Sequence, residues 1–114
     1  MRSGFERTLA AQLKSAKVSF EYEPDKLPYV LNYTYCPDFK LKNGIYIEAK
    51  GVLDQVTRSK MKAVKKAHPD LDIRFVFMNG KNRLSKSSKT TYMDWAAKNG
   101  FPAADGKIPD EWLT

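Results

Sequence analysis

The segment 35–51 constrains the fold of this chain more than any other, because two runs of alternating apolar and polar residues flank a turn signal. The dipeptide Asn43-Gly44 is typical of the tight turns that join antiparallel strands. The apolar positions of the two runs are Phe39, Leu41, Ile45 and Ile47. Alternation with this period predicts two strands, so the segment is expected to fold as a β-hairpin.

The register of this hairpin decides whether it carries a site. A two-residue Asn-Gly loop places the carboxylates of Asp38 and Glu48 on opposite faces of the sheet. A three-residue loop over 42–44, with Gly44 at positive φ, places Asp38 directly opposite Glu48 and on the same face. Lys50 follows two residues later and shares that face. We prefer the three-residue loop because it gathers these charges on one side.

In that register the side chains have the chemistry of a metal site. Two carboxylates whose Cβ atoms lie about 5 Å apart repel each other, so the pKa of each rises unless a cation lies between them. Hard oxygen ligands suit Mg²⁺ or Mn²⁺, which leave room for water and a substrate phosphate. A lysine beside them adds positive charge where a phosphoryl transition state gains negative charge. Exposed hairpins also carry such residues on plain solvated faces, and this alternative stays open.

The net charge of +7 is concentrated in one third of the chain. The segment 56–89 holds ten Lys and Arg against two Asp, which is +8, whereas the other residues hold ten basic against eleven acidic, which is −1. A local excess of this size favours a face that binds nucleic acid over a solvated basic face without a partner. The candidate DNA-binding residues are Arg58, Lys62, Lys65, Lys66, Lys81, Arg83, Lys86 and Lys89.

Length and composition limit the protein class. A chain of 114 residues is expected to form one domain over 1–114, and it contains no apolar run of the roughly 20 residues that a membrane span needs. Cys36 and His68 are the only residues of their kinds, so an internal disulfide is excluded and a zinc site is disfavoured. Both are expected to be structural, and we expect a cytoplasmic protein without membrane partners.

Helices are predicted in three places. The spacing of apolar residues predicts helices over 3–16 and 56–67, and Ala67 is expected to face the core. A third is expected to begin at Thr90 or Thr91 and to end before Gly100, which suits the positive φ of a helix stop. Beyond it, Trp112 is expected to be a core residue rather than one that stacks on a base.

Strands are predicted on either side of the hairpin. The segment 18–22 alternates, and 71–78 is so strongly apolar that it is expected to be a central strand. Between 18–22 and the hairpin, the segment 24–35 carries two prolines and is expected to be largely extended. This order of elements predicts an α/β fold with a mixed sheet flanked by helices.

At this point the sequence resembles a known family. Pro37-Asp38 followed by Glu48-Ala49-Lys50 resembles the PD-(D/E)xK signature of restriction-type nucleases. The surrounding sequence stretches resemble those of the bacteriophage endonuclease I family, which are enzymes of short-tailed phages that cut four-way DNA junctions. The similar stretches are Arg-Ser-Gly-Phe-Glu (2–6), Phe-Glu-Tyr-Glu (20–23), Pro-Tyr-Val (28–30), Thr-Tyr-Cys-Pro-Asp-Phe (34–39), Asn-Gly-Ile (43–45), Glu-Ala-Lys-Gly (48–51), His-Pro-Asp-Leu-Asp-Ile-Arg (68–74) and Ile-Pro-Asp-Glu-Trp (108–112).

The resemblance implies a restriction-endonuclease-like fold and a Mg²⁺-dependent DNA endonuclease, with Mn²⁺ as a substitute. Asp38, Glu48 and the Ala49 carbonyl are then expected to hold the metal, and Lys50 to act on the attacking water or the transition-state charge. It also implies a homodimer in which 24–35 bridges two subunits as an exchanged strand.

Glu6 has two interpretations. Ser3 and Glu6 fit a capping box, in which the Glu6 side chain accepts from the Ser3 amide. The resemblance implies instead that Glu6 is an active-site carboxylate that completes a second metal position or orients water.

Two rival functions stay open. The first is a nicking or homing-type endonuclease of the same fold that chooses a DNA sequence. The second is a basic DNA-binding protein without catalysis, in which the carboxylates are surface residues.

Overall fold

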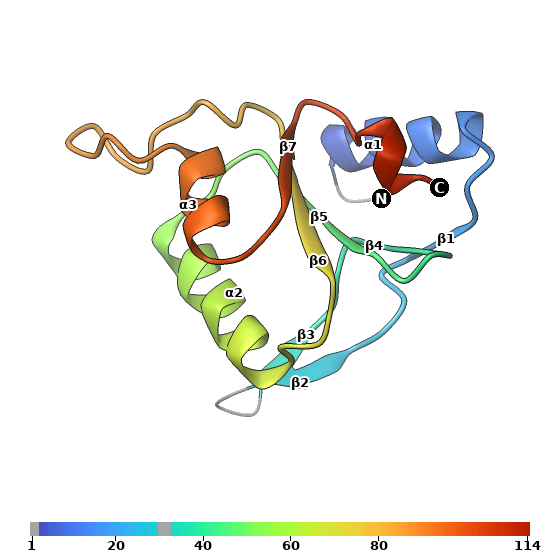
Figure 1. The fold of residues 1–114 in the computed structure, drawn as a ribbon, viewed down its shortest axis with the longest axis horizontal. Helices are drawn as coiled ribbons and strands as arrows, with labels where there is room; N and C mark the ends of the chain where they lie inside the picture. The colour runs from blue at the N-terminus through green and yellow to red at the C-terminus, as the bar shows by residue number, and fades with distance from the viewer. Residues whose placement is uncertain (1–2, 30–32) are drawn as a thin grey trace.

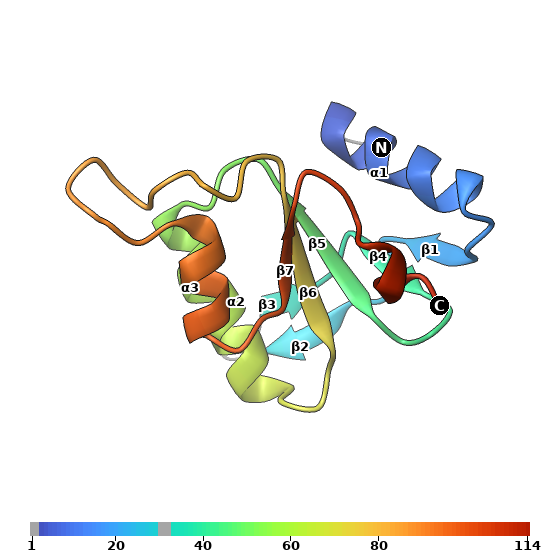
Figure 2. The same ribbon diagram turned by 45° about the horizontal axis from the view of Figure 1, so that its top comes forward.

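The computed structural model describes residues 3–29 and 33–114 and shows one mixed sheet with helices on both faces (Figure 1). Helix α1 (Gly4–Ser15) covers one face, and α2 (Gln55–Ala67) and α3 (Tyr92–Lys98) cover the other (Figure 2). The short 3₁₀ helix η2 (Asp110–Trp112) lies on the α1 side, near the C-terminus. The predicted α/β class with a mixed, helix-flanked sheet is therefore confirmed.

The sheet has five strands in the order β1-β4-β5-β6-β7. The first two pairings in this order are antiparallel, and the last two are parallel. Each parallel pair is connected through a helix, as a crossover between parallel strands requires. The strands are β1 (Phe20–Tyr22), β4 (Phe39–Leu41), β5 (Tyr46–Lys50), β6 (Ile73–Phe77) and β7 (Ala103–Asp105).

Two apolar cores lie on the two faces of the sheet. Strand β6 contributes to both, because Phe75 and Phe77 pack under α2 and α3 whereas Val76 points to the α1 side. All three side chains are fully buried, which explains the unbroken apolar run and confirms a central strand. On the α1 side, Leu9 and Leu13 pack at helical spacing against the sheet.

The boundaries of the three α-helices agree with the predicted ranges within a residue or two, and each of these helices has a capping side chain. Asp54 caps α2, and Thr91 caps α3 in a full capping box with Asp94. Gly100 follows α3 with φ of 79°, as expected for a helix stop.

The capping box proposed for α1 is only half formed. The Ser3 side chain accepts a hydrogen bond from the Glu6 amide at 3.0 Å. The Glu6 carboxylate accepts from the Ser3 hydroxyl at 3.2 Å and from the Tyr22 hydroxyl at 2.7 Å, rather than from the Ser3 amide. Because Tyr22 draws the carboxylate toward the sheet, Glu6 is buried, with only 7% of its surface exposed.

The segment 24–35 folds back on itself. Strands β2 (Leu27–Tyr29) and β3 (Tyr33–Tyr35) pair antiparallel within one chain, and residues 30–32 between them lie outside the described part. The segment is thus extended as predicted, but as two short strands. Tyr35 is fully buried in the core of its own chain. Exchange of this segment between chains stays a prediction.

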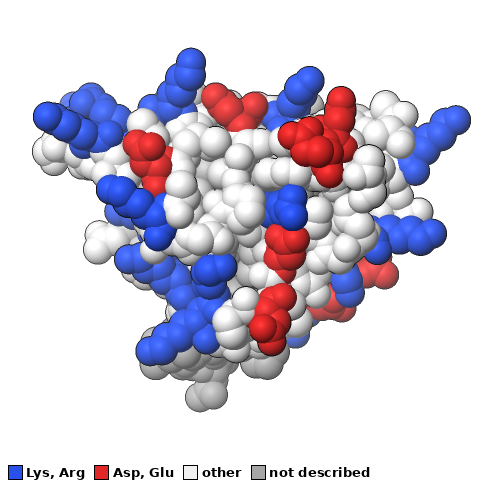
Figure 3. Space-filling model, viewed as in Figure 1, with Lys and Arg blue, Asp and Glu red and all other residues white. Residues whose placement is uncertain are grey.

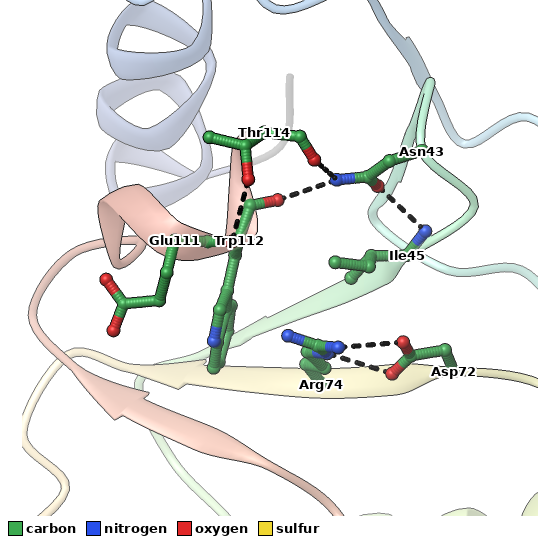
Figure 4. A network of polar contacts seen from close by, with 7 residues as sticks. All are labelled: Asn43, Ile45, Asp72, Arg74, Glu111, Trp112 and Thr114. Carbon is green, nitrogen blue, oxygen red and sulfur yellow. Dashed lines mark hydrogen bonds and ion pairs between the residues drawn. The ribbon is translucent and has the colours of Figure 1, made fainter.

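The C-terminal residues tie α1 to the hairpin turn. The Asn43 side chain donates to the carbonyls of Trp112 at 2.8 Å and Thr114 at 3.2 Å (Figure 4). In α1, the side-chain amide of Gln12 donates to the Ile108 carbonyl and accepts from the Ile108 N–H. Trp112 is buried, which confirms its predicted role as a core residue. We call residues 108–114 the C-terminal latch.

Four smaller expectations can be compared with the structure. Cys36 is half-buried between β3 and β4 rather than within a strand, whereas His68 caps the end of α2 as expected. Ala67 is exposed, although the helix pattern suggested that it faces the core. Among the described residues, no helix has the length and apolar character required to cross a membrane.

Candidate functional site: a buried carboxylate pair

The hairpin adopts the three-residue loop, so Asp38 and Glu48 lie opposite each other. Phe39 pairs with Ile47. In the same register Asp38, which directly precedes β4, lies opposite Glu48 on β5. Gly44 has φ of 94°, which an L-residue rarely adopts and which closes this loop. The predicted register is therefore confirmed.

Both carboxylates are buried, with exposed fractions of 7% for Asp38 and 3% for Glu48. The Ala49 amide donates to Oδ2 of Asp38 at 2.8 Å and fixes that side chain. Lys50 Nζ lies 3.6 Å from Oε2 of Glu48 and forms an ion pair with it. The three residues therefore share one side of the strand end, as the pattern predicted.

Burial makes two negative charges costly at this place. Loss of solvent and the charge of Glu48 raise the pKa of Asp38 from 3.8 to about 8, despite the Ala49 amide and Lys50, which lower it. Loss of solvent also raises the pKa of Glu48, and Lys50 acts against this. One carboxyl of the pair therefore holds a proton near neutral pH when no further cation is present.

Two residues of this site were missed by the sequence reasoning. The hydroxyl of Tyr35, from β3, lies near Glu48, so burial and that charge raise the pKa of Tyr35 well above its usual value. Lys60, from α2, places its ammonium 5.8 Å from the centroid of the Tyr35 ring, and its charge lowers the pKa of Glu48. Neither position differs in pattern from its neighbours, so only the tertiary fold reveals them.

Glu6 approaches the pair from the helix on the other face of the sheet. Its charge contributes to the raised pKa of Asp38, although it is the smallest of the causes. Within residues 3–29 and 33–114, however, no three His, Cys, Asp or Glu residues are arranged to hold one metal ion. The structure thus brings Glu6 near Asp38 without joining it to a single ligand group with Glu48.

The donor set fits a hard divalent cation. Oε1 of Glu48 is buried and, among the described residues, has no hydrogen-bond partner. The Tyr35 hydroxyl is also buried without one, so the interaction of these two groups is electrostatic and lacks hydrogen-bond geometry. An unsatisfied carboxylate oxygen next to a second buried carboxylate is what Mg²⁺ or Mn²⁺ binds well.

Comparison with known proteins agrees with this geometry. The sequence matches the family described as Phage endonuclease I over residues 1–114. The chain belongs to the phage endonuclease I family. It is 44% identical over 115 residues to "Endonuclease I" of Escherichia phage T7, which covers 98% of this chain and 77% of that protein. It is 43% identical over 111 residues to "Endodeoxyribonuclease 1" of Enterobacteria phage T3, covering 95% of this chain and 73% of that protein.

In this member of the phage endonuclease I family, basic side chains line the side of the molecule that carries α2 and the segment 79–91 (Figure 3). Six of the eight predicted DNA-binding residues are exposed there, and they are Lys62, Lys66, Lys81, Arg83, Lys86 and Lys89. The other two are engaged within the chain. Arg58 donates to the Leu53 carbonyl at 2.8 Å, and Lys65 donates to the Gly100 carbonyl at 3.1 Å.

Proposed function

We propose that this chain is a metal-dependent DNA endonuclease that hydrolyses phosphodiesters in four-way junctions or other branched DNA. The observation that carries the proposal is the buried, directly opposed pair of Asp38 and Glu48 with Lys50 beside it. Membership of the phage endonuclease I family supports cleavage of DNA, and relatives carry the names "Endonuclease I" and "Endodeoxyribonuclease 1". Metal dependence and branch selection are our proposals.

Asp38, Glu48 and the Ala49 carbonyl would hold Mg²⁺, with Mn²⁺ as a substitute. A divalent ion bound there lowers the pKa of its water and neutralises charge on the phosphate. Burial favours metal binding here, because a cation interacts more strongly with two carboxylates that are shielded from solvent than with exposed ones. The Ala49 amide holds Asp38 in its orientation.

The other residues act on water, phosphate and charge. Lys50 orients the attacking water or stabilises the negative charge that develops on the phosphoryl oxygens. Glu6, held by the hydroxyls of Ser3 and Tyr22, orients that water or contributes to a second metal position. The exposed Lys and Arg of the basic side would act through phosphate contacts and DNA shape.

We further propose a homodimer in which the segment 24–35 is exchanged. A four-way junction presents two equivalent strands, so an assembly with two sites suits it better than a single chain. Co-refolding of inactive Glu6→Ala with inactive Asp38→Ala tests this. An exchanged dimer regains one working site, because both lesions fall in the same pocket. A mixed but inactive dimer, or a monomer in sedimentation, contradicts exchange.

The test of the function is cleavage of matched four-way, nicked and linear DNA with Mg²⁺. Asp38→Ala, Glu48→Ala and Lys50→Ala are each expected to abolish cleavage, while folding and DNA binding persist. Wild-type turnover in any one of these variants removes that residue from the mechanism. Preference for a sequence in linear DNA over branched DNA favours a nicking or homing-type enzyme. Binding without cleavage by the wild-type chain supports a non-catalytic DNA-binding protein.

A further inference from the structure

Lys60 differs from the other basic residues of α2 in what it approaches. Its ammonium lies 5.8 Å from the ring centroid of Tyr35, a side chain that is fully buried. The hydroxyl end of the same ring lies near Glu48. Lys60 is itself half-buried, whereas Lys62 and Lys66 on the same helix are exposed. Lys60 thus approaches the carboxylate site from α2.

Lys60 forms no ion pair among the described residues, although its charge acts on Glu48 and lowers the pKa of that carboxyl. Lys50 forms an ion pair with Glu48 at 3.6 Å. In residues 3–29 and 33–114, the other ion pairs are those of Lys40 with Asp25 and Arg74 with Asp72, and Lys60 takes part in none. An ammonium without an ion-pair partner can donate charge-assisted hydrogen bonds to an incoming anion.

The DNA backbone is the anion that the proposed function brings to this place. A cleaved strand carries its next phosphates one nucleotide away on either side, at a rise of about 3.4 Å per nucleotide in a duplex. The buried carboxylates repel these phosphates. Lys50 is already paired with the carboxylate of Glu48. A second cation at the edge of the site offsets that repulsion where the strand enters or leaves.

We propose that Lys60 binds a DNA phosphate next to the one that is cleaved and so sets the position of the strand over Asp38 and Glu48. The inference rests on the proposed nuclease function and adds a residue and a second phosphate subsite to it. Lys60 is a positioning residue, because it acts on the neighbouring phosphate and leaves the reacting atoms to the carboxylates and Lys50.

The competing explanation is purely structural. A lysine over an aromatic ring contributes to stability through a cation–π contact. Such a contact changes the stability of the protein when it is removed, but it has no relation to any one phosphate of the substrate. A coupling between Lys60 and a particular phosphate therefore separates the two explanations.

The experiment is a double-mutant cycle between protein and DNA. Branched substrates carry a single neutral methylphosphonate at successive positions around the cleaved bond, and cleavage with Mg²⁺ is measured at saturating DNA. Lys60→Met removes the charge and keeps an apolar stem over Tyr35, and Lys60→Arg restores a cation. Lys62→Ala serves as the matched loss of charge from the same helix.

We expect Lys60→Met and one methylphosphonate adjacent to the cut each to slow cleavage about ten-fold, because each removes the same charged contact. Together they are expected to slow it about ten-fold rather than about a hundred-fold. Lys60→Arg should recover most of the rate. Lys62→Ala should weaken DNA binding, and at saturating DNA its cleavage rate should respond to each methylphosphonate as the wild-type rate does.

The assignment is overturned if the effect of Lys60→Met on the cleavage rate multiplies with that of the methylphosphonate at every position. It is also overturned if Lys60→Met cleaves at the wild-type rate. If Lys60→Met unfolds, Lys60→Gln replaces it in the cycle, because glutamine also removes the charge. A wild-type chain that cleaves no DNA overturns the proposed function itself, and this result is distinct from cleavage without coupling.

Discussion

Replacement of Asp38 by asparagine should make the metal-free protein more stable, and increasingly so as the pH rises. The pKa of Asp38 is raised from 3.8 to about 8, so the folded chain keeps a proton that the unfolded chain releases near pH 3.8. Because the folded state then binds more protons, the free energy of unfolding falls as the pH rises between these values. The introduced amide does not titrate, and its oxygen can still accept from the Ala49 N–H.

The size of the effect follows from the two pKa values. Between pH 5 and pH 7, a carboxyl that titrates at 3.8 when unfolded and at about 8 when folded costs about 2.5 kcal/mol of stability. A folded pKa one unit lower still gives about 2 kcal/mol over the same range. The stability of Asp38→Asn relative to wild type should therefore rise by about 2 to 3 kcal/mol between pH 5 and pH 7.

Urea unfolding in metal-free buffer at several pH values measures this difference directly. Asp54→Asn is the matched control, since Asp54 is exposed and its hydrogen bond to the Thr57 amide lowers its pKa. Because the pKa of Asp54 is lower in the folded chain than in the unfolded chain, its contribution to stability is complete above the unfolded pKa. The free energy of unfolding of this control should therefore differ from that of wild type by a constant amount between pH 5 and pH 7.

Mg²⁺ at pH 7 should then stabilise wild type, because a cation favours the ionised pair, but have little effect on Asp38→Asn. An Asp38→Asn difference that stays flat from pH 5 to pH 7 would refute the reasoning. In that case Asp38 is ionised in the folded protein, and the pair is either exposed or already compensated by another cation.

Contacts outside the carboxylate pair give three more tests. Lys65→Met removes an ammonium that lies 4.9 Å from the Phe101 ring centroid; urea unfolding should show a loss of about 1 kcal/mol, and no loss would contradict a structural role for Lys65. Asn43→Ala removes two hydrogen bonds to the latch, one of them to the Trp112 carbonyl; thermal unfolding should show a loss of about 1 to 2 kcal/mol, more than a surface substitution causes. Lys86→Ala should reduce the salt slope of DNA binding by about one unit, and an unchanged slope would place the DNA elsewhere.

The hairpin could be predicted from sequence because its information is local. Gly44 allows the positive φ of a three-residue loop, and this loop alone sets which residues of the two arms are opposed. The positions of Asp38, Glu48 and Lys50 follow from that register. Helix boundaries were predictable for a similar reason, since caps such as Thr91 act within one turn.

The remaining parts depend on contacts between distant residues. Strand β7 is only three residues long and has small side chains, so it carries no alternating pattern and exists because it pairs in parallel with β6. Lys60 belongs to a helix rich in lysine, and only the packing of α2 over Tyr35 distinguishes it. The apposition of Glu6 with Asp38 likewise depends on how α1 packs on the sheet.

The C-terminal latch has a consequence for the nascent chain. The ribosome makes residues 108–114 after every residue of the carboxylate site. Until the latch emerges, α1 lacks the bonds from Gln12 to Ile108 and the apolar cover of Trp112. A chain that stops short of the latch therefore holds α1, the helix that carries Glu6, through fewer contacts. Synthesis of the latch thus completes the packing of α1 only after every residue of the carboxylate pair has been made.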